Sequence, residues 1–420
     1  MKELFVWRVG NRDAQLVGRI TASPIEFIYE PEYLESSNAH ALSFSLPLQS
    51  EPYAENAMRP YFNGLLPENE TRTAIAGALN TTPDDFLSIL LYCGREIIGD
   101  IAVTDTDQLP INGSYEPLEE NELKAIFAGY SSLAESNRES RLSLAGSQGK
   151  TGLAHLPGKS LDDGWLRPLD GAASTHVLKV SSLEDIPLLE YLCMRAASEV
   201  GIRVPYVDLL FFGRPVFCIE RFDRIASMSN GNPSVKRLHQ EDFAQAFGVG
   251  ARAKYSELSP STASAVADFI RRRSSSPIRD LEEFAKISLF NYLIGNCDNH
   301  LKNMSILYSA SWESCSLAPA YDLVSTTRYE RFSTEMGMAI NGKREIGDID
   351  AADWMAFTRD IGVHESELAS FCKQFATTIP TAIQAAALHH DSIPALPWVA
   401  DDLCEEIIPR LEVLEEVARG

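Results

Sequence analysis

Long apolar runs and paired cysteines are both missing from this 420-residue chain. Apolar stretches such as Phe86–Leu91 are far shorter than the roughly 20 residues that a membrane-spanning helix needs. The 7 cysteines form no Cys-x-x-Cys pair, which argues against a disulfide framework or a structural zinc site. The first residues, MKELFVWRVGNRD, lack the basic region and apolar core of a signal peptide. We therefore expect reduced, buried thiols, no membrane partner and a cytoplasmic protein.

Basic side chains are also scarce, because 37 Lys and Arg face 59 Asp and Glu and leave a net charge of −22. Nucleic-acid binding depends on neutralising phosphates with Lys and Arg, so the chain by itself is a poor DNA binder. Such a chain can still meet DNA through a basic partner, or act on a basic partner directly.

Strand and helix patterns divide the chain into three parts. Residues 1–110 alternate short strands with helices, and a Pro-, Asn- and Gly-rich stretch at 109–119 is typical of a linker. Residues 111–228 continue as strand, helix and hairpin, whereas residues 229–420 show mainly helical periodicity. We predict an α+β, two-lobed, protein-kinase-like fold. Its α/β N-terminal lobe carries an extra N-terminal subdomain, and its C-terminal lobe is all-α.

The stretch NYLIGNCDNHLKNMSIL at residues 291–307 places Asp298, His300 and Asn303 between two apolar segments. An Asp followed five positions later by an Asn is the layout of a kinase catalytic loop. In that layout Asp298 accepts the proton of the substrate hydroxyl, and Asn303 holds a metal ion. Asp322, in Ala-Tyr-Asp-Leu, adds a second carboxylate for the metal. The alternative is a simple turn, since Asp and Asn favour caps and turns, but a polar run between apolar segments favours a functional site.

The segment Ala145–Thr151 is rich in small residues and contains Lys150. A Walker A motif needs a glycine where Leu144 stands, so that pattern fails. Small residues nevertheless let backbone N–H groups approach phosphates, and Lys150 adds a positive charge. A solvated surface turn is the alternative.

Lys179 is the one charged residue in the apolar strand predicted at Thr175–Val180. It fits an edge or strand-end lysine, or a lysine that pairs with ATP phosphates and with a glutamate on the next helix. Glu190 is the central candidate for that glutamate, with Glu184 and Glu199 less central. The linear order favours the second interpretation, because phosphate loop, lysine, glutamate, hinge strand, catalytic loop and metal-binding Asp follow one another as in protein kinases.

With these parts assembled, the chain resembles the HipA family of bacterial Ser/Thr kinase toxins over nearly its full length. The resemblance rests on FNGLLPENETR, SLAGSQGK, THVLK, CIERFDR, RLHQEDFAQAFG, LIGNCDNHLKN and APAYDL. It implies binding of ATP and Mg²⁺ and phosphoryl transfer to a Ser or Thr of a protein, such as an aminoacyl-tRNA synthetase. It also implies a HipB-like helix-turn-helix antitoxin as partner, through which the chain would meet operator DNA indirectly.

The resemblance also assigns roles to matching positions. Asp298 corresponds to the catalytic base, and Asn303 and Asp322 correspond to metal ligands. Ser143 corresponds to a serine that family members autophosphorylate, and a phosphate there would be repelled from an ATP-phosphate site. Glu220 and Phe222 match the hinge whose backbone meets adenine. The nucleotide contacts implied in this way are Ser147, Gln148, Gly149, Lys150, Lys179, Glu220, Phe222, His300 and Tyr321.

Two other functions stay open on sequence alone. The chain would be a non-catalytic co-repressor if its main work were to bind the antitoxin on operator DNA, although the intact Asp298, Asn303 and Asp322 favour catalysis. Phosphorylation of a small molecule is the third interpretation. Elsewhere, Arg271–Arg273 are expected at an exposed helix end and His389–His390 as a surface pair.

Overall fold

The computed structural model describes residues 3–10, 14–108, 113–128, 149–229, 232–390 and 393–419. Contacts divide the chain into two compact units. Unit 1 consists of Met1–Val180, Leu210–Ala253 and Leu307–Glu313, and unit 2 of Ser181–Leu209, Lys254–Ile306 and Ser314–Gly420. The chain passes from one unit to the other within strands β10 (Val207–Phe211) and β15 (Ser305–Tyr308). The division into domains at residues 110 and 228 stays a prediction.

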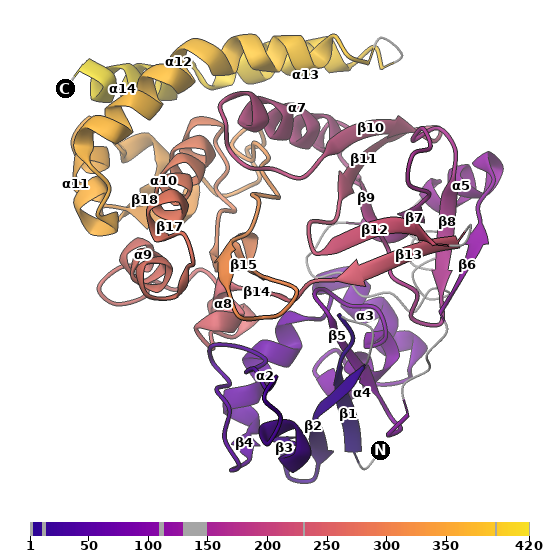
Figure 1. Ribbon diagram of the computed structural model, residues 1–420. Coiled ribbons are helices and arrows are strands. Elements are labelled where there is room, and N and C mark those ends of the chain that lie inside the picture. Colours follow the sequence, from indigo (N-terminus) through magenta and orange to yellow (C-terminus); the bar gives the residue numbers. More distant parts are fainter. Residues whose placement is uncertain are drawn as a thin grey trace. The chain divides into compact units, whose positions relative to one another are not determined.

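Unit 1 begins with an antiparallel five-stranded sheet in the order β4-β3-β2-β1-β5 (Figure 1). Its strands are β1 (Glu3–Arg8), β2 (Gln15–Ala22), β3 (Ile25–Tyr29), β4 (Tyr53–Ala54) and β5 (Ile101–Thr104). The helices of this region are α1 (Pro31–Leu34), α2 (Glu55–Gly64), α3 (Asn69–Ala78) and α4 (Phe86–Cys93). Helix α4 begins after Asp85, because the Asp85 side chain accepts a hydrogen bond from the Ser88 amide at 3.2 Å.

A second sheet in unit 1 has the order β10-β11-β9-β7-β8-β6. Its other strands are β6 (Ser114–Pro117), β7 (Gly149–His155), β8 (Trp165–Leu169), β9 (His176–Val180) and β11 (Pro215–Glu220). Helix α5 (Glu120–Phe127) contributes Leu123, Ile126 and Phe127 to the core of this region. Strand β6 corrects the predicted linker at 109–119, since its residues pair with β8 at the edge of the sheet, where a proline is tolerated.

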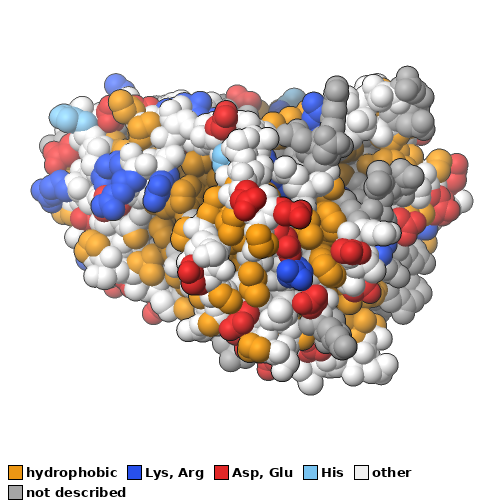
Figure 2. All heavy atoms as spheres, turned by 60° about the horizontal axis from the view of Figure 1, so that its bottom comes forward, with side chains coloured by type: hydrophobic (Ala, Val, Ile, Leu, Met, Phe, Trp, Pro, Cys, Tyr) orange, Lys and Arg blue, Asp and Glu red, His pale blue; other side chains and the backbone are white. Residues whose placement is uncertain are grey.

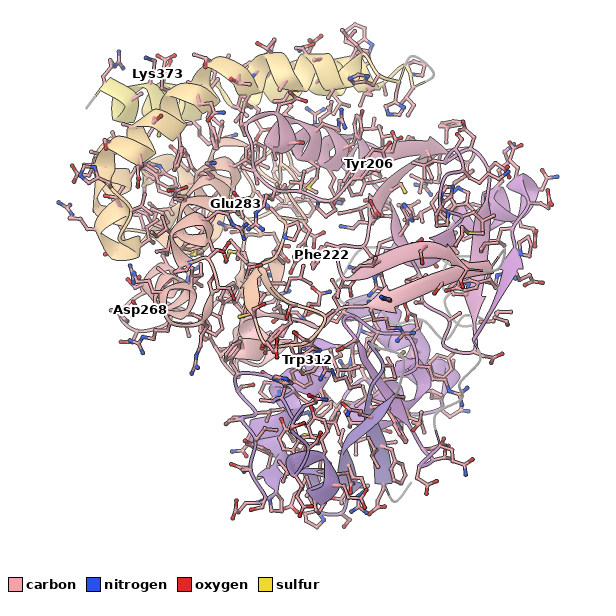
Figure 3. The ribbon with its side chains drawn as sticks, viewed as in Figure 1. Tyr206, Phe222, Asp268, Glu283, Trp312 and Lys373 are labelled. Carbon is pink, nitrogen blue, oxygen red and sulfur yellow. The ribbon has the colours of Figure 1, made fainter. Side chains whose placement is uncertain are left out.

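The remainder of unit 1 contains short elements. They are the hairpin of β12 (Arg224–Ser229) and β13 (Asn232–Arg237), strand β14 (Gln240–Asp242), helix α8 (Phe243–Ala246) and the 3₁₀ turn Ala251–Ala253. The segment Leu307–Glu313 joins this unit through Trp312, labelled in Figure 3. The Trp312 indole donates to Asp100 Oδ2 at 2.9 Å and stacks on His239 with ring centroids 3.8 Å apart.

Unit 2 is largely helical (Figure 1). Its helices are α7 (Ile186–Glu199), α9 (Thr262–Arg273), α10 (Pro277–Leu293), α11 (Ala351–Ile361), α12 (Glu365–Ala387), α13 (Leu396–Glu406) and α14 (Ile408–Arg419). Short strands β16 (Cys315–Leu317), β17 (Glu335–Ile340) and β18 (Lys343–Glu345) and the 3₁₀ turns Leu301–Asn303 and Ile346–Asp348 were not predicted. No helix among the described residues is both long and apolar enough to cross a membrane.

Charge and thiol chemistry follow the expectations from composition. All seven cysteines are free thiols, and all but the half-buried Cys404 are buried. Arg271–Arg273 are exposed at the end of α9, as predicted. On the face drawn in Figure 2, most Lys and Arg side chains gather toward one side and acidic side chains are spread over the remainder.

Candidate active site

The loop that follows α10 carries Asp298, His300 and Asn303 in unit 2. The chain leaves the helix through Gly295, whose φ of +70° is accessible to glycine without strain. Asn296 then braces the loop on both sides. Its Nδ2 donates to Asn291 Oδ1 at 2.7 Å, and its Oδ1 accepts from the Asp298 amide at 3.1 Å. The backbone at Asp298 is therefore held by neighbouring side chains.

The Asp298 carboxylate is the exposed group of this loop. Its side chain is 50% accessible, whereas the Asn299 and His300 side chains are buried. The Tyr255 hydroxyl donates a hydrogen bond to Asp298 Oδ1, and His300 Nε2 lies 3.7 Å from the same oxygen. The Tyr255 and His300 rings meet edge to face with centroids 4.9 Å apart. A carboxylate placed in this way is accessible to the proton of an incoming hydroxyl.

Asn303 and Asp322 line one hollow in unit 2. Asn303 Nδ2 donates to the Asp298 carbonyl at 2.7 Å, so the amide oxygen is the atom that Asn303 can present to a cation. Asp322 has a φ of +54°, an unfavourable conformation for a residue with a Cβ, and its carbonyl accepts from Asn296 Nδ2 at 3.1 Å. The structure thus brings together two residues that the sequence separates. The other residues around the hollow are Ile287, Ser288, Asn291, Asn296, Asn299, Met304, Tyr321 and Met338.

The Tyr321 hydroxyl forms hydrogen bonds beside the same hollow. The hydroxyl donates to the Lys302 carbonyl at 2.9 Å and lies 2.6 Å from the Ser305 hydroxyl. Tyr321 therefore ties the segment before Asp322 to the end of the loop that carries Asp298 and Asn303. Its assignment as a nucleotide contact stays a prediction.

Strand β17 supplies support that the sequence did not reveal. The Gly337 amide donates to the Cys297 carbonyl at 2.8 Å, directly before Asp298. A Cβ at Gly337 would lie 2.9 Å from the carbonyl carbon of Asn299, so a side chain here would press on the loop backbone. A glycine between two methionines gives no signal of this close approach, because the neighbouring segment lies about 40 residues earlier in the chain.

Lys179 and Lys150 lie opposite each other in unit 1. Lys179 is 6% exposed on β9, an interior strand of its sheet, so its interpretation as an edge lysine is wrong. Lys150 pairs directly with Lys179 across β7 and β9, so both side chains project from the same face. Lys179 Nζ also lies 5.7 Å from the centroid of the Phe217 ring. Two like charges at directly opposed positions repel each other.

The remaining predicted residues fall in different places. Gly149 and Lys150 begin strand β7 and do not belong to a loop, which corrects the loop prediction at this end. Glu220 is exposed at the end of β11, and the half-buried Phe222 follows it (Figure 3). Ser143, Ser147 and Gln148 lie outside the described residues.

The glutamate predicted to pair with Lys179 stays a prediction. Glu190 is 1% exposed on α7 and belongs to unit 2, whereas Lys179 belongs to unit 1. His390, expected in a surface pair, instead has a partner in unit 2: its Nε2 lies 2.9 Å from Asp208 Oδ1. Its ring also meets that of Tyr191 edge to face, with centroids 5.0 Å apart.

The side chains at this site could bind Mg²⁺ through oxygen atoms. In the part of the chain that the structure describes, no group of three or more His, Cys, Asp and Glu is placed to hold a metal ion. Mg²⁺ does not need such a group, since it usually binds one or two protein oxygens and takes phosphates and waters for the other positions. The carboxylate of Asp322 and the amide oxygen of Asn303 fit that requirement.

Comparison with known proteins identifies the family. The HipA N-terminal domain model matches residues 11–104, and the HipA-like C-terminal domain model matches residues 142–383. Y4mE of Sinorhizobium fredii, a protein named as a kinase, is 34% identical over 365 residues that cover 84% of each chain. The chain belongs to the HipA family of kinases. The Ser/Thr-protein kinase toxin HipA of Shewanella oneidensis is 28% identical over 384 residues, 88% of this chain and 85% of that protein.

A solved structure supports the same fold. The complex of Shewanella oneidensis HipA with HipB and its operator DNA contains a chain that matches with a TM-score of 0.81 at 24% identity, covering 99% of both chains. The predicted α+β, kinase-like architecture of this HipA-family member is thereby confirmed.

Proposed function

We propose that this HipA-family kinase transfers the γ-phosphoryl group of ATP to a Ser or Thr hydroxyl of a protein and acts as a growth-arresting toxin. The observation that carries the proposal is the half-exposed Asp298 carboxylate in a loop whose Asn303 shares a hollow with Asp322. These are the residue types, in the order, that phosphoryl transfer by protein kinases requires. The name of the Shewanella relative, a Ser/Thr-protein kinase toxin, agrees with it.

In the proposed reaction, Asp298 receives the proton of the substrate hydroxyl. The hydroxyl oxygen forms a bond to the γ-phosphorus while the bond from that phosphorus to the bridging oxygen of ADP breaks. Because the Asp298 backbone is held by Asn296 and Asn303, its carboxylate keeps its position while it takes the proton.

The Asn303 amide oxygen and the Asp322 carboxylate would hold Mg²⁺. When bound, the ion neutralises charge on the phosphates. Asp322 adopts its left-handed conformation beside Asn296, so the segment that carries this carboxylate is braced by the same asparagine that braces Asp298.

In unit 1, Lys150 and Lys179 would bind the ATP phosphates. Their direct cross-strand pairing puts both side chains on one face of the sheet, where each ammonium group could donate to a phosphate oxygen. The backbone at Glu220 and Phe222 would meet adenine, and Ser147, Gln148, Gly149, His300 and Tyr321 would make further nucleotide contacts.

Partner and regulation are part of the same proposal. The Shewanella neighbour was solved with HipB and operator DNA, and a HipB-like antitoxin would similarly bring this chain to DNA. The net charge of −22 agrees with an indirect contact, because a basic partner would supply the surface that DNA needs. We further propose autophosphorylation at Ser143 as an off switch and an aminoacyl-tRNA synthetase as a candidate substrate.

The test is incubation of the purified protein with γ-labelled ATP and Mg²⁺, alone and with a bacterial extract. Asp298→Asn is the matched control, since it keeps the shape of the side chain and removes its basicity. We expect Asp298-dependent label in protein, and a rate about 100- to 10,000-fold lower in the control.

The other outcomes of this labelling experiment would each contradict a different part of the proposal. Equal incorporation by both proteins would overturn the role of Asp298, and no incorporation by either would favour a co-repressor that does not catalyse. Label that appears only in small molecules would point to a different acceptor. Phosphopeptide mapping that finds no label at Ser143 would remove the off switch alone.

A further inference from the structure

Tyr255 contacts the proposed catalytic base without being part of the catalytic loop. It stands 43 positions before Asp298, and its side chain is exposed with a fractional accessibility of 46%. Its hydroxyl nevertheless donates a hydrogen bond to Asp298 Oδ1. In the proposed reaction, a Ser or Thr hydroxyl must donate to this same carboxylate. The phenol therefore makes the contact that the substrate has to make.

The backbone of Tyr255 is anchored although its ring is exposed. Arg344 Nη2 donates to the Tyr255 carbonyl at 2.9 Å and to Glu257 Oε2 at 2.8 Å. Arg344 Nη1 donates to the carbonyls of Met336 and Gly337 at 3.0 and 2.9 Å. Gly337 in turn lies against the catalytic loop. One arginine thus links the segment that carries Tyr255 to the strand that supports Asp298.

The Tyr255 hydroxyl is not needed to build the catalytic loop. Asn296 holds the Asp298 amide and Asn303 holds the Asp298 carbonyl, whereas Tyr255 bonds to the carboxylate. The Tyr255 ring meets His300 on one side, and Lys254 Nζ lies 5.3 Å from its centroid. Rotation of an exposed side chain about χ1 moves the hydroxyl without any change in these backbone contacts.

We propose that Tyr255 is a self-inhibitory gate whose hydroxyl occupies the position of the acceptor hydroxyl until a protein substrate displaces it. The inference rests on the proposed kinase function. It makes Tyr255 a specificity-determining residue, because only an acceptor that can move the ring aside gains access to Asp298. A protein surface around the acceptor residue can supply that binding energy, and water or a small alcohol cannot.

The gate reduces the apparent affinity for the acceptor in proportion to the fraction of molecules in which the gate is open. If the base is accessible in about one molecule in ten, the apparent KM for the acceptor is about tenfold above its intrinsic value. Loss of the phenolic hydroxyl removes the bond that holds the gate shut. Tyr255→Phe should therefore lower KM for a protein acceptor about three- to tenfold and leave kcat within about twofold.

The experiment uses the full chain, Mg²⁺ and labelled ATP, with myelin basic protein as a basic acceptor. Initial rates are measured over a range of acceptor concentrations, beside release of inorganic phosphate from ATP. Tyr206→Phe is the matched control (Figure 3), because Tyr206 is also exposed and its hydroxyl donates to an aspartate, Asp208 Oδ2, at 3.0 Å. We expect no change in KM or kcat for this control.

The outcomes separate the gate from the function on which it rests. If neither myelin basic protein nor water accepts phosphate in an Asp298-dependent reaction, the proposed function fails and the gate with it. If turnover depends on Asp298 but Tyr255→Phe behaves as the unaltered chain, the gate alone fails. A lower kcat at unchanged KM would show that Tyr255 positions Asp298. Label on Tyr255 itself would show that Tyr255 is a phosphate acceptor. Either result would overturn the gate.

Discussion

Charged groups serve opposite purposes in two regions of this molecule. In unit 1, an ion cluster is formed by four residues that are each 6% exposed or less, Glu96, Asp223, Arg221 and Arg224. In unit 2, the Asp298 side chain is 50% exposed and its carboxylate accepts a hydrogen bond from the exposed Tyr255. Buried charges that pair with one another hold the fold together, whereas an exposed carboxylate is accessible to a substrate.

The buried cluster is organised around Glu96. Glu96 Oε1 accepts from the Ser174 amide at 3.0 Å, from Arg221 Nη1 at 3.1 Å and from Arg224 Nη2 at 3.2 Å, and Arg237 Nη2 lies 2.7 Å from Oε2. Burial alone would raise the pKa of Glu96, but Arg237, Arg224 and Arg221 outweigh it and the net pKa lies below its ordinary value. Glu96 is therefore charged at neutral pH, and its removal leaves Asp223 as the remaining carboxylate of the cluster beside the buried Arg221 and Arg224.

Glu96→Ala should produce the largest change, a loss of about 3–5 kcal/mol in the free energy of unfolding, because breaking a buried pair strands the opposite charge. Asp298→Asn, at the exposed carboxylate, should cost less than about 0.5 kcal/mol. Urea unfolding followed by circular dichroism measures both. Equal losses in the free energy of unfolding of the two variants would contradict the expectation that burial determines how much a charged side chain contributes to stability.

Lower pH should weaken unit 1 through His176. Burial lowers the pKa of His176 to about 3, and the nearby His155 adds to this. The unfolded chain has the ordinary value of about 6.5, so between the two it binds the extra proton and stability falls as pH falls. About 2 kcal/mol should be lost between pH 6.5 and pH 5. His176→Gln provides the reference curve, and the same slope in both proteins would show that other groups cause it.

Glu120→Ala should produce the smallest change in the free energy of unfolding, because Glu120 is an exposed counterpart of the buried Glu96. Glu120 forms an exposed i,i+4 pair with Lys124 on α5, with side chains 71% and 47% accessible. Exposed pairs contribute little, so we expect a loss below about 1 kcal/mol that shrinks in high salt. The same unfolding assay at low and high salt tests this, and a loss comparable to that of Glu96→Ala would contradict it.

The ion pairs of the buried cluster could not be predicted from the sequence. The sequence CIERFDR resembles a kinase hinge because of Glu220 and Phe222. It contains no signal that Arg221 bonds to Glu96, which lies 125 positions earlier in the chain. Asp298 and Asn303 lie only five residues apart and interact directly, because the Asn303 side chain donates to the Asp298 carbonyl. Their catalytic role stays a prediction. Tyr255, Gly337 and Arg344 escaped prediction, since each reaches the loop from a distant segment.

The sequence by itself determined the family, the α+β kinase-like class and the order of the parts from Lys150 to Asp322. Those signals are local, because helix periodicity, capping and loop motifs depend on residues a few positions apart. Only the tertiary structure decided that Lys179 lies on an interior strand opposite Lys150, that Asn303 shares a hollow with Asp322, and that Tyr255 bonds to Asp298. Such contacts depend on how whole elements pack against one another, and no short pattern in the chain encodes them.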